Sequence, residues 1–369
     1  MFFVHFTREL LGSRLRNYRT LLGGKLKKTT TFVALLAVAA LSFSATPAAN
    51  AATTKACLAL DTGGVDDKSF NASAWAGANA AAKANSSVTV KYLSAASDAD
   101  YAPNIKKLVD EKCTIIVGVG FLINEAIVAG AKANPTVNFA IVDQDGLADG
   151  KRLPNLKALQ FDTNESSFQA GYVAAGVSKT GKVATYGGLN IPPVTIFMDG
   201  FAKGVAHYNK AKGKKVEVLG WDIAKKDGTF VGGFSDSAKA LQISKNFEQQ
   251  GADVIFPVAG GLGGATAGNS LTSKKSVVIW VDTDGVKAAP QYRKVLLTSV
   301  VKGVDTSVRA VILDQAAGKF SSTGYFGNLK NQGTYLAPYH DLIRRVPTAL
   351  RTEVTKLGND IRNGKVSAK

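Results

Sequence analysis

The chain has 369 residues, of which 46% are hydrophobic and 20% charged, and this composition excludes a disordered or collagen-like protein. The length suggests two domains of ordinary size. The formal net charge is +17, but the basic residues are dispersed lysines, without an arginine-rich stripe that carries interleaved aromatic residues. We therefore expect no nucleic acid as a partner. A basic surface that faces an anionic cell envelope accounts for the charge.

Residues 1–51 have the pattern of an export signal peptide. Three lysines within residues 25–28 precede the apolar run FVALLAVAALSFS (32–44), and the segment ANA that ends at Ala51 supplies the small residues of a cleavage site. The run is shorter than the roughly 20 residues that a membrane-spanning helix needs. The leader has a net charge of +6, which leaves +11 for the mature chain. We expect cleavage near Ala51 and a mature protein that is extracellular or associated with the cell envelope.

Apolar runs that end in glycine or aspartate then alternate with helical stretches, which is the pattern of parallel α/β sheets. The first half has expected strands at ACLALDTGG (56–64), SVTVKYLS (87–94), TIIVGVGF (114–121) and NFAIVDQDG (138–146). The helices between them are expected at 69–85, near 101–111 and at 124–134.

The second half repeats this order. Its expected strands are KVATYGGLN (182–190), VEVLGWDI (216–223), DVIFPVAGG (253–261) and VVIWVDTDG (277–285), with helices at about 197–212, at 237–250 and near 265–273. The fourth strands of the two halves end alike, in VDQDG and VDTDG. Because ligands of open parallel sheets bind beyond the carboxyl ends of the strands, two facing lobes would gather these ends in one cleft and hinge around a ligand.

One more strand, KVLLTSVV (294–301), and a helix, DTSVRAVILDQAAG (305–318), follow the second half. We expect this unit to return to the first lobe, so that the chain crosses between the lobes several times. The expected N-terminal lobe contains residues 52–163 plus about 294–324, and the C-terminal lobe contains about 164–293 plus about 325–369.

Two cysteines, Cys57 and Cys113, remain after the signal, and each begins an apolar strand-like run. An even pair in an exported protein favours a disulfide, and if the two strands are neighbours, both thiols lie at the same end of the sheet. Such a link would stabilise the fold by about 4 kcal/mol in the chain-entropy model. A lipid anchor on Cys57 is the alternative, but this cysteine lies well past the apolar run.

The stretch DTGGVDDKSFNASAW begins where the first strand ends. Asp61 closes a buried strand, where a carboxylate needs hydrogen-bond donors, and the following glycine pair permits a tight turn whose N–H groups approach a ligand. Asp66, Asp67 and Ser69 also fit as caps or first-turn acids of the next helix. For the two aspartates and Lys68 we favour capping over ligand contact.

An enzyme is the competing interpretation of this stretch. DTGGVDD is similar to the DxDxxxDD calcium cluster of nucleoside hydrolases, but its second aspartate is missing and its aspartate pair comes one residue early. Too few oxygens remain for calcium, which takes about six to eight. His207 and His340, in polar and surface-like contexts, offer no nucleophile–base pair, and AGGLGG (259–264) lacks the Gly-Lys-Ser/Thr of a phosphate loop. We expect no catalysis, no metal and no cofactor.

Five residues at strand ends and loops suggest a binding site instead. Phe70 and Phe234 can sandwich a planar ring between the lobes, whereas Phe230 and the three tryptophans fit core packing. Asp143 and Asp282 end equivalent strands, and Lys302 follows another strand. Carboxylates accept hydrogen bonds from vicinal hydroxyls, and a lysine donates to a hydroxyl or ring oxygen. A base attached to a sugar fits this set better than a phosphate or a metal.

These motifs carry a family resemblance. DTGGVDDKSFNASAW, FDTNESSFQAGYVAA (161–175), VIFPVAGG, and VDTDG with LTSVVK resemble the basic membrane protein (PnrA-like) family, from about residue 56 to the end. These are extracytoplasmic nucleoside-binding proteins of ABC importers. The resemblance implies a periplasmic-binding-protein type I fold, with two Rossmann-like lobes joined by a hinge. It also implies a purine nucleoside ligand, and the permease and ATPase subunits of an ABC transporter as partners of a monomer.

The resemblance also implies roles for individual residues. In the family pattern the base is contacted by Asp61 and stacked on by Phe70 and Phe234, and the ribose is held by Asp143, Asp282 and Lys302, with Asn71 and Gly260 nearby. Asn164 and Glu165 would be structural, at the first crossing between the lobes. Bacterial members are often lipoproteins with a cysteine directly after the signal, and this chain departs from that arrangement. Two alternatives remain: the same scaffold holding another polar solute such as a sugar, and a nucleoside-cleaving enzyme.

Overall fold

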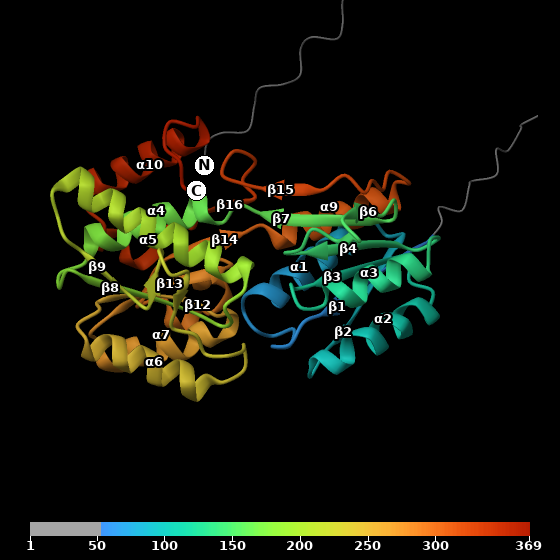
Figure 1. The fold of residues 1–369 in the computed structure, drawn as a ribbon, viewed down its shortest axis with the longest axis horizontal. Coiled ribbons are helices and arrows are strands. Elements are labelled where there is room, and N and C mark those ends of the chain that lie inside the picture. Colours follow the sequence, from blue (N-terminus) through green and yellow to red (C-terminus); the bar gives the residue numbers. More distant parts are fainter. Residues whose placement is uncertain (1–52) are drawn as a thin grey trace, which may run out of the picture. The chain divides into compact units, whose positions relative to one another are not determined.

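A computed structural model describes residues 53–369, and the expected signal peptide and its cleavage site lie outside this part of the chain. The described residues form two six-stranded sheets, with strand orders β15-β7-β4-β3-β1-β2 and β16-β14-β13-β12-β8-β9. Figure 1 shows the two sheets with helices packed on them. The α/β class with two parallel-sheet lobes, predicted from the alternating pattern, is confirmed.

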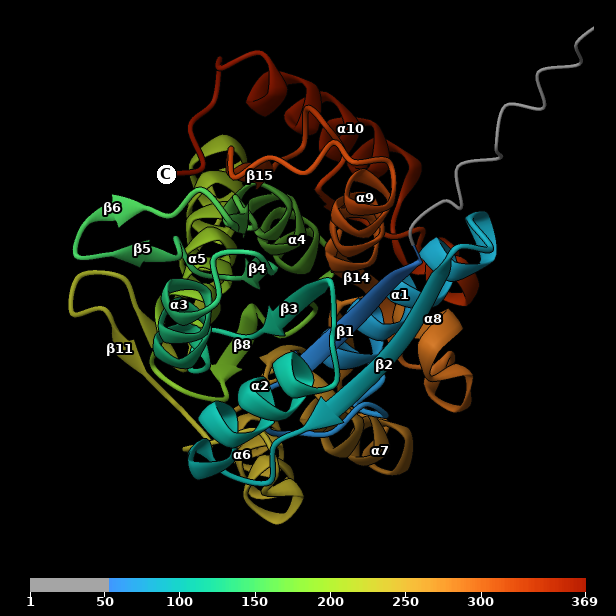
Figure 2. The ribbon, with the colours of Figure 1, turned by 90° about the vertical axis from the view of Figure 1, so that its right-hand side faces the viewer.

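The first sheet is parallel throughout. Its strands are β1 (Thr54–Leu60), β2 (Val88–Ser94), β3 (Ile115–Val119), β4 (Asn138–Val142), β7 (Leu156–Phe161) and β15 (Tyr325–Gly327). Figure 2 shows β1 and β2 side by side, as their register requires. One face is covered by α1 (Phe70–Ala84) and α9 (Val304–Ala316), and the other by α2 (Tyr101–Asp110) and α3 (Asn124–Ala133). Covering both faces explains why the central strands β1, β3 and β4 are buried almost throughout.

The second sheet has five parallel strands and one antiparallel edge strand. They are β8 (Lys182–Gly187), β9 (Glu217–Leu219), β12 (Val254–Val258), β13 (Val277–Asp282), β14 (Leu296–Lys302) and the antiparallel β16 (Thr334–Leu336). One face packs on α4 (Asn164–Val177), α5 (Pro192–Lys212) and α10 (Thr348–Arg362), and the other on α6 (Ser237–Gln249) and α7 (Gly263–Ser273).

Several short elements complete the fold. Two small hairpins are formed by β5 (Leu147–Ala148) with β6 (Lys151–Arg152), and by β10 (Trp221–Asp222) with β11 (Asp227–Gly228). One helical turn, α8 (Gly285–Ala288), follows β13, and 3-10 turns lie at Asp98–Asp100, Gly260–Leu262, Pro290–Tyr292 and His340–Arg345. Among the described helices, none is both long and apolar enough to cross a bilayer.

The chain passes between the two sheets three times: after β7, after β14, and between β15 and β16. This differs from the expected lobe boundaries. The strand expected at 294–301 pairs with β13 in the second sheet, and only the helix after it, α9, packs on the first sheet. Residues 325–327, expected in the C-terminal lobe, pair with β7 in the first sheet. A buried apolar strand has the same pattern in either sheet, so the sequence did not show that the chain crosses after β14.

Two of the crossings are tied together by side chains near the start of α4. The carboxylate of Glu165 accepts a hydrogen bond from the Leu329 N–H at 2.7 Å. The Ser166 and Thr334 hydroxyls are hydrogen-bonded to each other inside the protein. Asn164 is buried, and its backbone lies against Gly200 so closely that a Cβ there would come within 2.5 Å of the Asn164 carbonyl oxygen. These contacts support the structural role expected of Asn164 and Glu165.

Cys57 on β1 and Cys113, two residues before β3, are joined in a disulfide. Because β1 and β3 are neighbours in the sheet, the two cysteines meet as the sequence predicted. Both side chains are buried beneath α2 and α3.

Candidate functional site

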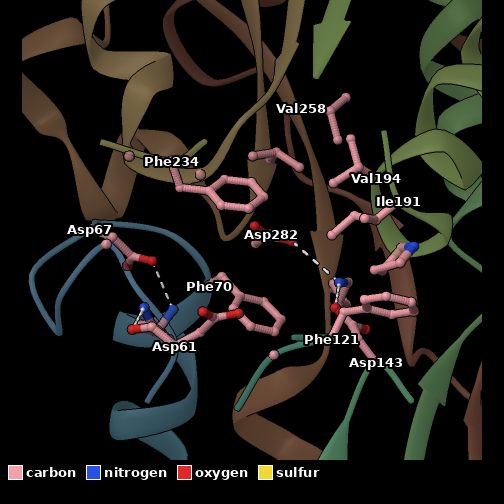
Figure 3. Close-up of a pocket in the computed structure, with 18 of the residues that line it drawn as sticks. Asp61, Asp67, Phe70, Phe121, Asp143, Ile191, Val194, Phe234, Val258 and Asp282 are labelled. Atoms are coloured by element: carbon pink, nitrogen blue, oxygen red, sulfur yellow. Dashed lines mark hydrogen bonds and ion pairs between the residues drawn. The ribbon is translucent and has the colours of Figure 1, made fainter. Parts of the chain in front are cut away.

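A pocket with about 640 Å³ of empty space, its open mouth included, lies between the carboxyl ends of the two sheets (Figure 3). The first sheet contributes residues that follow β1, β3 and β4, and the second contributes the last residues of β12, β13 and β14. The lining includes every residue that the sequence analysis assigned to ligand contact: Asp61, Phe70, Asn71, Asp143, Phe234, Gly260, Asp282 and Lys302.

Lys302 is a buried cation in the lining of this pocket, and its side chain is only 4% exposed. Its ammonium nitrogen lies 2.6 Å from a carboxylate oxygen of Asp143 and 3.9 Å from one of Asp282. The same nitrogen lies 4.8 Å from the ring centre of Phe70 and 5.3 Å from that of Phe197. Two carboxylates and the neighbouring aromatic faces thus compensate a charge that would be costly to bury alone.

Asp143 and Asp282 are equivalent in backbone conformation as well as in position. Asp143 directly follows β4, and Asp282 is the last residue of β13. Each has a positive φ, +69° for Asp143 and +65° for Asp282. Burial raises the pKa of Asp143, with the Lys302 ammonium acting against the rise. Burial also raises the pKa of Asp282 to about 6, while Lys302 and the Ser69 hydroxyl act in the opposite direction. Each carboxylate keeps acceptor capacity for a ligand hydroxyl.

Asp61, directly after β1, is held by groups of its own lobe. Its Oδ1 accepts hydrogen bonds from the Tyr101 hydroxyl and, at 2.6 Å, from the Thr62 N–H. Gly120 lies against the other oxygen: a Cβ there would come within 2.2 Å of Oδ2, and its φ is +126°. Burial raises the pKa of Asp61, and the hydrogen bonds from Tyr101 and Thr62 act against the rise. Since both donors use Oδ1, Oδ2 is the oxygen left to accept from a ligand.

The acidic loop before α1 fulfils the expected capping role through one residue. The Asp67 carboxylate accepts from the backbone N–H groups of Ser69, Asn71 and Ala72 at 2.8–2.9 Å, whereas Asp66 is exposed. The expectation that the Ser69 side chain caps this helix is wrong. Its hydroxyl donates instead to Asp282 in the other lobe, at 2.8 Å.

Aromatic side chains enter the pocket from both lobes. Phe70 is the first residue of α1, and Phe234 lies in the loop before α6. Figure 3 shows their rings on opposite sides of the space. The Phe234 ring rests on Gly188, where a Cβ would approach it to 2.2 Å. Phe230 packs edge-on against Trp221, at 6.2 Å between ring centres, which agrees with its assignment to the core.

The sequence analysis missed an apolar wall of the pocket. It is formed by Phe121, Ile191, Pro193, Val194, Phe197 and Val258. Phe121 follows β3 almost directly, and α5 begins at Pro192 instead of the predicted 197. A signal existed in the Pro-Pro pair at 192–193, because proline is favoured in the first turn of a helix. That turn lies beyond the carboxyl end of β8, where pocket residues are expected.

The pocket carries more negative than positive charge. Its lining contains four carboxylates, those of Asp61, Asp67, Asp143 and Asp282, against the one ammonium group of Lys302. Such a lining repels phosphates and favours neutral ligands rich in hydroxyl or N–H donors. Within residues 53–369, no group of three or more His, Cys, Asp or Glu side chains is placed to hold a metal ion. Of the acids in DTGGVDD that resemble a calcium cluster, Asp61 accepts from Tyr101 and Thr62, Asp67 accepts from backbone N–H groups, and Asp66 is exposed.

Comparison with known proteins agrees with this geometry. Residues 55–327 match the family described as ABC transporter substrate-binding protein PnrA-like. The ABC transporter nucleoside-binding protein BmpA of Lactococcus lactis is 31% identical over 330 residues, covering 85% of this chain and 88% of that protein. Basic membrane protein D of Borreliella burgdorferi is 29% identical, with 92% and 94% covered. An ABC transporter solute-binding protein from Aeropyrum pernix has the same fold, with a TM-score of 0.74, 24% identity, and 85% and 92% covered.

Proposed function

Because this chain belongs to the PnrA-like family of ABC transporter substrate-binding proteins, we propose that it binds a purine nucleoside between its lobes and delivers it to an ABC importer. The observation that carries the proposal is the combination of two opposed phenylalanines with a carboxylate–lysine cluster in one pocket. The similarity to a nucleoside-binding protein of Lactococcus lactis supports the same ligand class.

The base would lie between the rings of Phe70 and Phe234. Stacking of a base on an aromatic side chain contributes about 1–3 kcal/mol, and both rings line the pocket. Asp61 is at the first-lobe end of the site, with Oδ2 available to accept from an N–H of the base. Asn71 and Gly260 line the same space.

The ribose would lie against Asp143, Asp282 and Lys302. The ammonium group between two carboxylates donates, and the carboxylate oxygens accept, which suits the vicinal 2′ and 3′ hydroxyls of a ribose. The net negative charge of the lining disfavours nucleotides, since a phosphate would face carboxylates at close range. We infer that the ligand is a nucleoside without a phosphate.

In this proposal the protein carries out no chemistry, and closure of the lobes holds the ligand. Its partners would be the permease and ATPase subunits of the importer, and it would act as a monomer outside the cytoplasm after removal of the leader. The Cys57–Cys113 disulfide agrees with an exported protein.

Calorimetric titration of the mature protein tests the proposal. We expect guanosine, inosine or adenosine to bind with a Kd of about 1 µM or tighter, which is about −8 kcal/mol, and the matching 5′-monophosphates to bind at least about 100-fold more weakly. Ribose, glucose and galactose are the matched sugar controls. No heat with any purine nucleoside would refute the proposal, and tight binding of a free sugar would replace it with the sugar-binding alternative.

A second measurement separates binding from catalysis. Incubation of the protein with inosine or guanosine, followed by chromatography, should return the intact nucleoside. Release of free base and ribose in proportion to protein concentration and time would establish a nucleoside-cleaving enzyme instead.

A further inference from the structure

The loop between β1 and α1 extends from the first lobe to the second at Lys68. The backbone carbonyl of Lys68 accepts hydrogen bonds from the Thr283 hydroxyl at 3.0 Å and from the Trp280 indole N–H at 3.3 Å. Trp280 lies on β13 in the second sheet, and Thr283 follows that strand directly. One carbonyl of the first lobe is therefore held by two side chains of the other.

The next residue, Ser69, makes a second contact across the same boundary. Its side chain is completely buried, and its hydroxyl lies 2.8 Å from Oδ2 of Asp282 and 3.1 Å from the carbonyl oxygen of Val281. A hydroxyl has one proton to donate, and the carboxylate is the stronger acceptor. Ser69 thus orients a carboxylate that lines the pocket, although Ser69 itself is outside the pocket lining.

The loop that carries these groups is fixed by contacts within its own lobe and to the second lobe. Three backbone N–H groups bind the Asp67 carboxylate, and Lys68 is kept at a φ of +57° with its side chain in solvent. A non-glycine residue in this region costs on the order of 1–3 kcal/mol unless its surroundings compensate it. Gly261 of the second lobe packs against the Asp67 carbonyl, where a Cβ would come within 2.7 Å.

We propose that Lys68 and Ser69 form an interlobe latch with Trp280, Asp282 and Thr283, and that Ser69 is a positioning residue for the ligand-binding carboxylate of Asp282. The hydrogen bonds join opposite lobes, so they exist only when the lobes are closed. Opening breaks the contacts of the Lys68 carbonyl and removes the donor from Asp282 in the same movement. The latch therefore sets the lifetime of the closed state, and with it the rate at which the ligand leaves.

The identity of the ligand rests on the proposed function, whereas the latch itself requires only that the lobes close. Two variants address it separately: Thr283→Val removes a half-exposed donor to Lys68, and Ser69→Ala removes the donor to Asp282. Thr272→Val is the matched control, because the Thr272 hydroxyl donates to Gly268 within its own helix, α7. The variants should retain the wild-type circular dichroism and unfold cooperatively.

Stopped-flow displacement of guanosine measures the lifetime of the closed state. We expect dissociation to be about 5–10-fold faster in Thr283→Val and about 10–100-fold faster in Ser69→Ala, in line with the loss of a neutral and of a charge-assisted hydrogen bond. Association should change less than about threefold, because affinity changes in related complexes lie mainly in dissociation. Dissociation rates equal to those of the wild type and of Thr272→Val would overturn the latch.

Exchange of the Trp280 indole proton gives a readout that needs no ligand. The chain has 3 tryptophans, so the indole signals in a ¹⁵N-labelled sample are few, and Trp280→Phe identifies the one of interest. We expect this proton to exchange at least about five times more slowly in the wild type than in Thr283→Val, since the hydrogen bond to Lys68 protects it. Equal rates would overturn the latch. If the wild type binds no purine nucleoside while this difference is observed, the proposed ligand fails and the latch stands.

Discussion

The ammonium group of Lys302, at the end of β14 in the second sheet, lies 2.6 Å from the carboxylate of Asp143, which follows β4 in the first sheet. The pair therefore joins the two lobes inside the pocket. A carboxylate oxygen of Asp282 lies 3.9 Å from the same ammonium group. One cation therefore compensates two carboxylates at the ends of equivalent strands. Removing either kind of charge should change stability and ligand binding together.

Replacing Lys302 with methionine should destabilise the protein. The change leaves two buried carboxylates without their cation, and breaking a buried ion pair costs about 3–5 kcal/mol. Urea denaturation at neutral pH should show this loss in the free energy of unfolding, with binding of purine nucleosides abolished. The double variant Lys302→Met/Asp143→Asn should recover part of the stability. Lys330→Met, at an exposed site, is the control, and an equal loss there would contradict the argument.

Replacing Asp282 with asparagine should stabilise the protein above about pH 6 while weakening ligand binding. Asp282 has a pKa raised to about 6 in the fold, against about 3.9 in an unfolded chain. Since the folded state binds this proton more tightly, its contribution makes unfolding easier as pH rises from about 4 to about 6. We expect Asp282→Asn to raise the free energy of unfolding by about 3 kcal/mol at neutral pH relative to wild type, and the difference to shrink towards pH 4. A pH-independent difference would argue against a buried, ionised Asp282.

Replacing Phe234 with alanine should weaken nucleoside binding and leave the fold intact. The ring lines the pocket from a loop, and losing a stacking partner costs about 1–3 kcal/mol, or roughly 5- to 150-fold in Kd. Calorimetry with guanosine measures the change. Phe326→Ala, at a side chain that is 53% exposed on β15, is the matched control and should bind as the wild type does. Unchanged affinity in Phe234→Ala would remove the stacking role.

Removing the disulfide with Cys57→Ala and Cys113→Ala should lower stability without altering affinity. The bond closes a loop with a sequence separation of 56 residues, and a link of this length contributes about 4 kcal/mol in the chain-entropy model, less if the reduced chain retains structure. Chemical denaturation of the double variant and of the oxidised wild type gives the difference. Because neither cysteine lines the pocket, Kd should stay within about twofold of wild type. A large loss of affinity would mean that the bond shapes the site.

The amino-acid sequence was sufficient to predict the elements and the strand-end residues of the site. Apolar runs closed by glycine or aspartate are local features, and the repeated VDQDG and VDTDG endings place Asp143 and Asp282 at equivalent positions. Parallel strands expose their carboxyl ends at one edge, so residues predicted at those ends, such as Asp61 and Lys302, line one pocket. The Cys57–Cys113 bond followed from the same reasoning, because it depends only on neighbouring strands.

Tertiary structure alone decided which distant groups meet. A buried strand has the same apolar pattern in either sheet, so the place of β14 beside β13 was settled by packing. The local sequence is compatible with a Ser69 side chain that caps its own helix, yet the Ser69 hydroxyl donates a hydrogen bond to Asp282 in the other lobe. The apolar wall that includes Ile191, Val194 and Val258 also depends on tertiary packing, because these residues lie at the start of α5 and the end of β12. Local sequence patterns record the periodicity of one element, whereas these contacts depend on how two lobes, joined by three crossings, pack against each other.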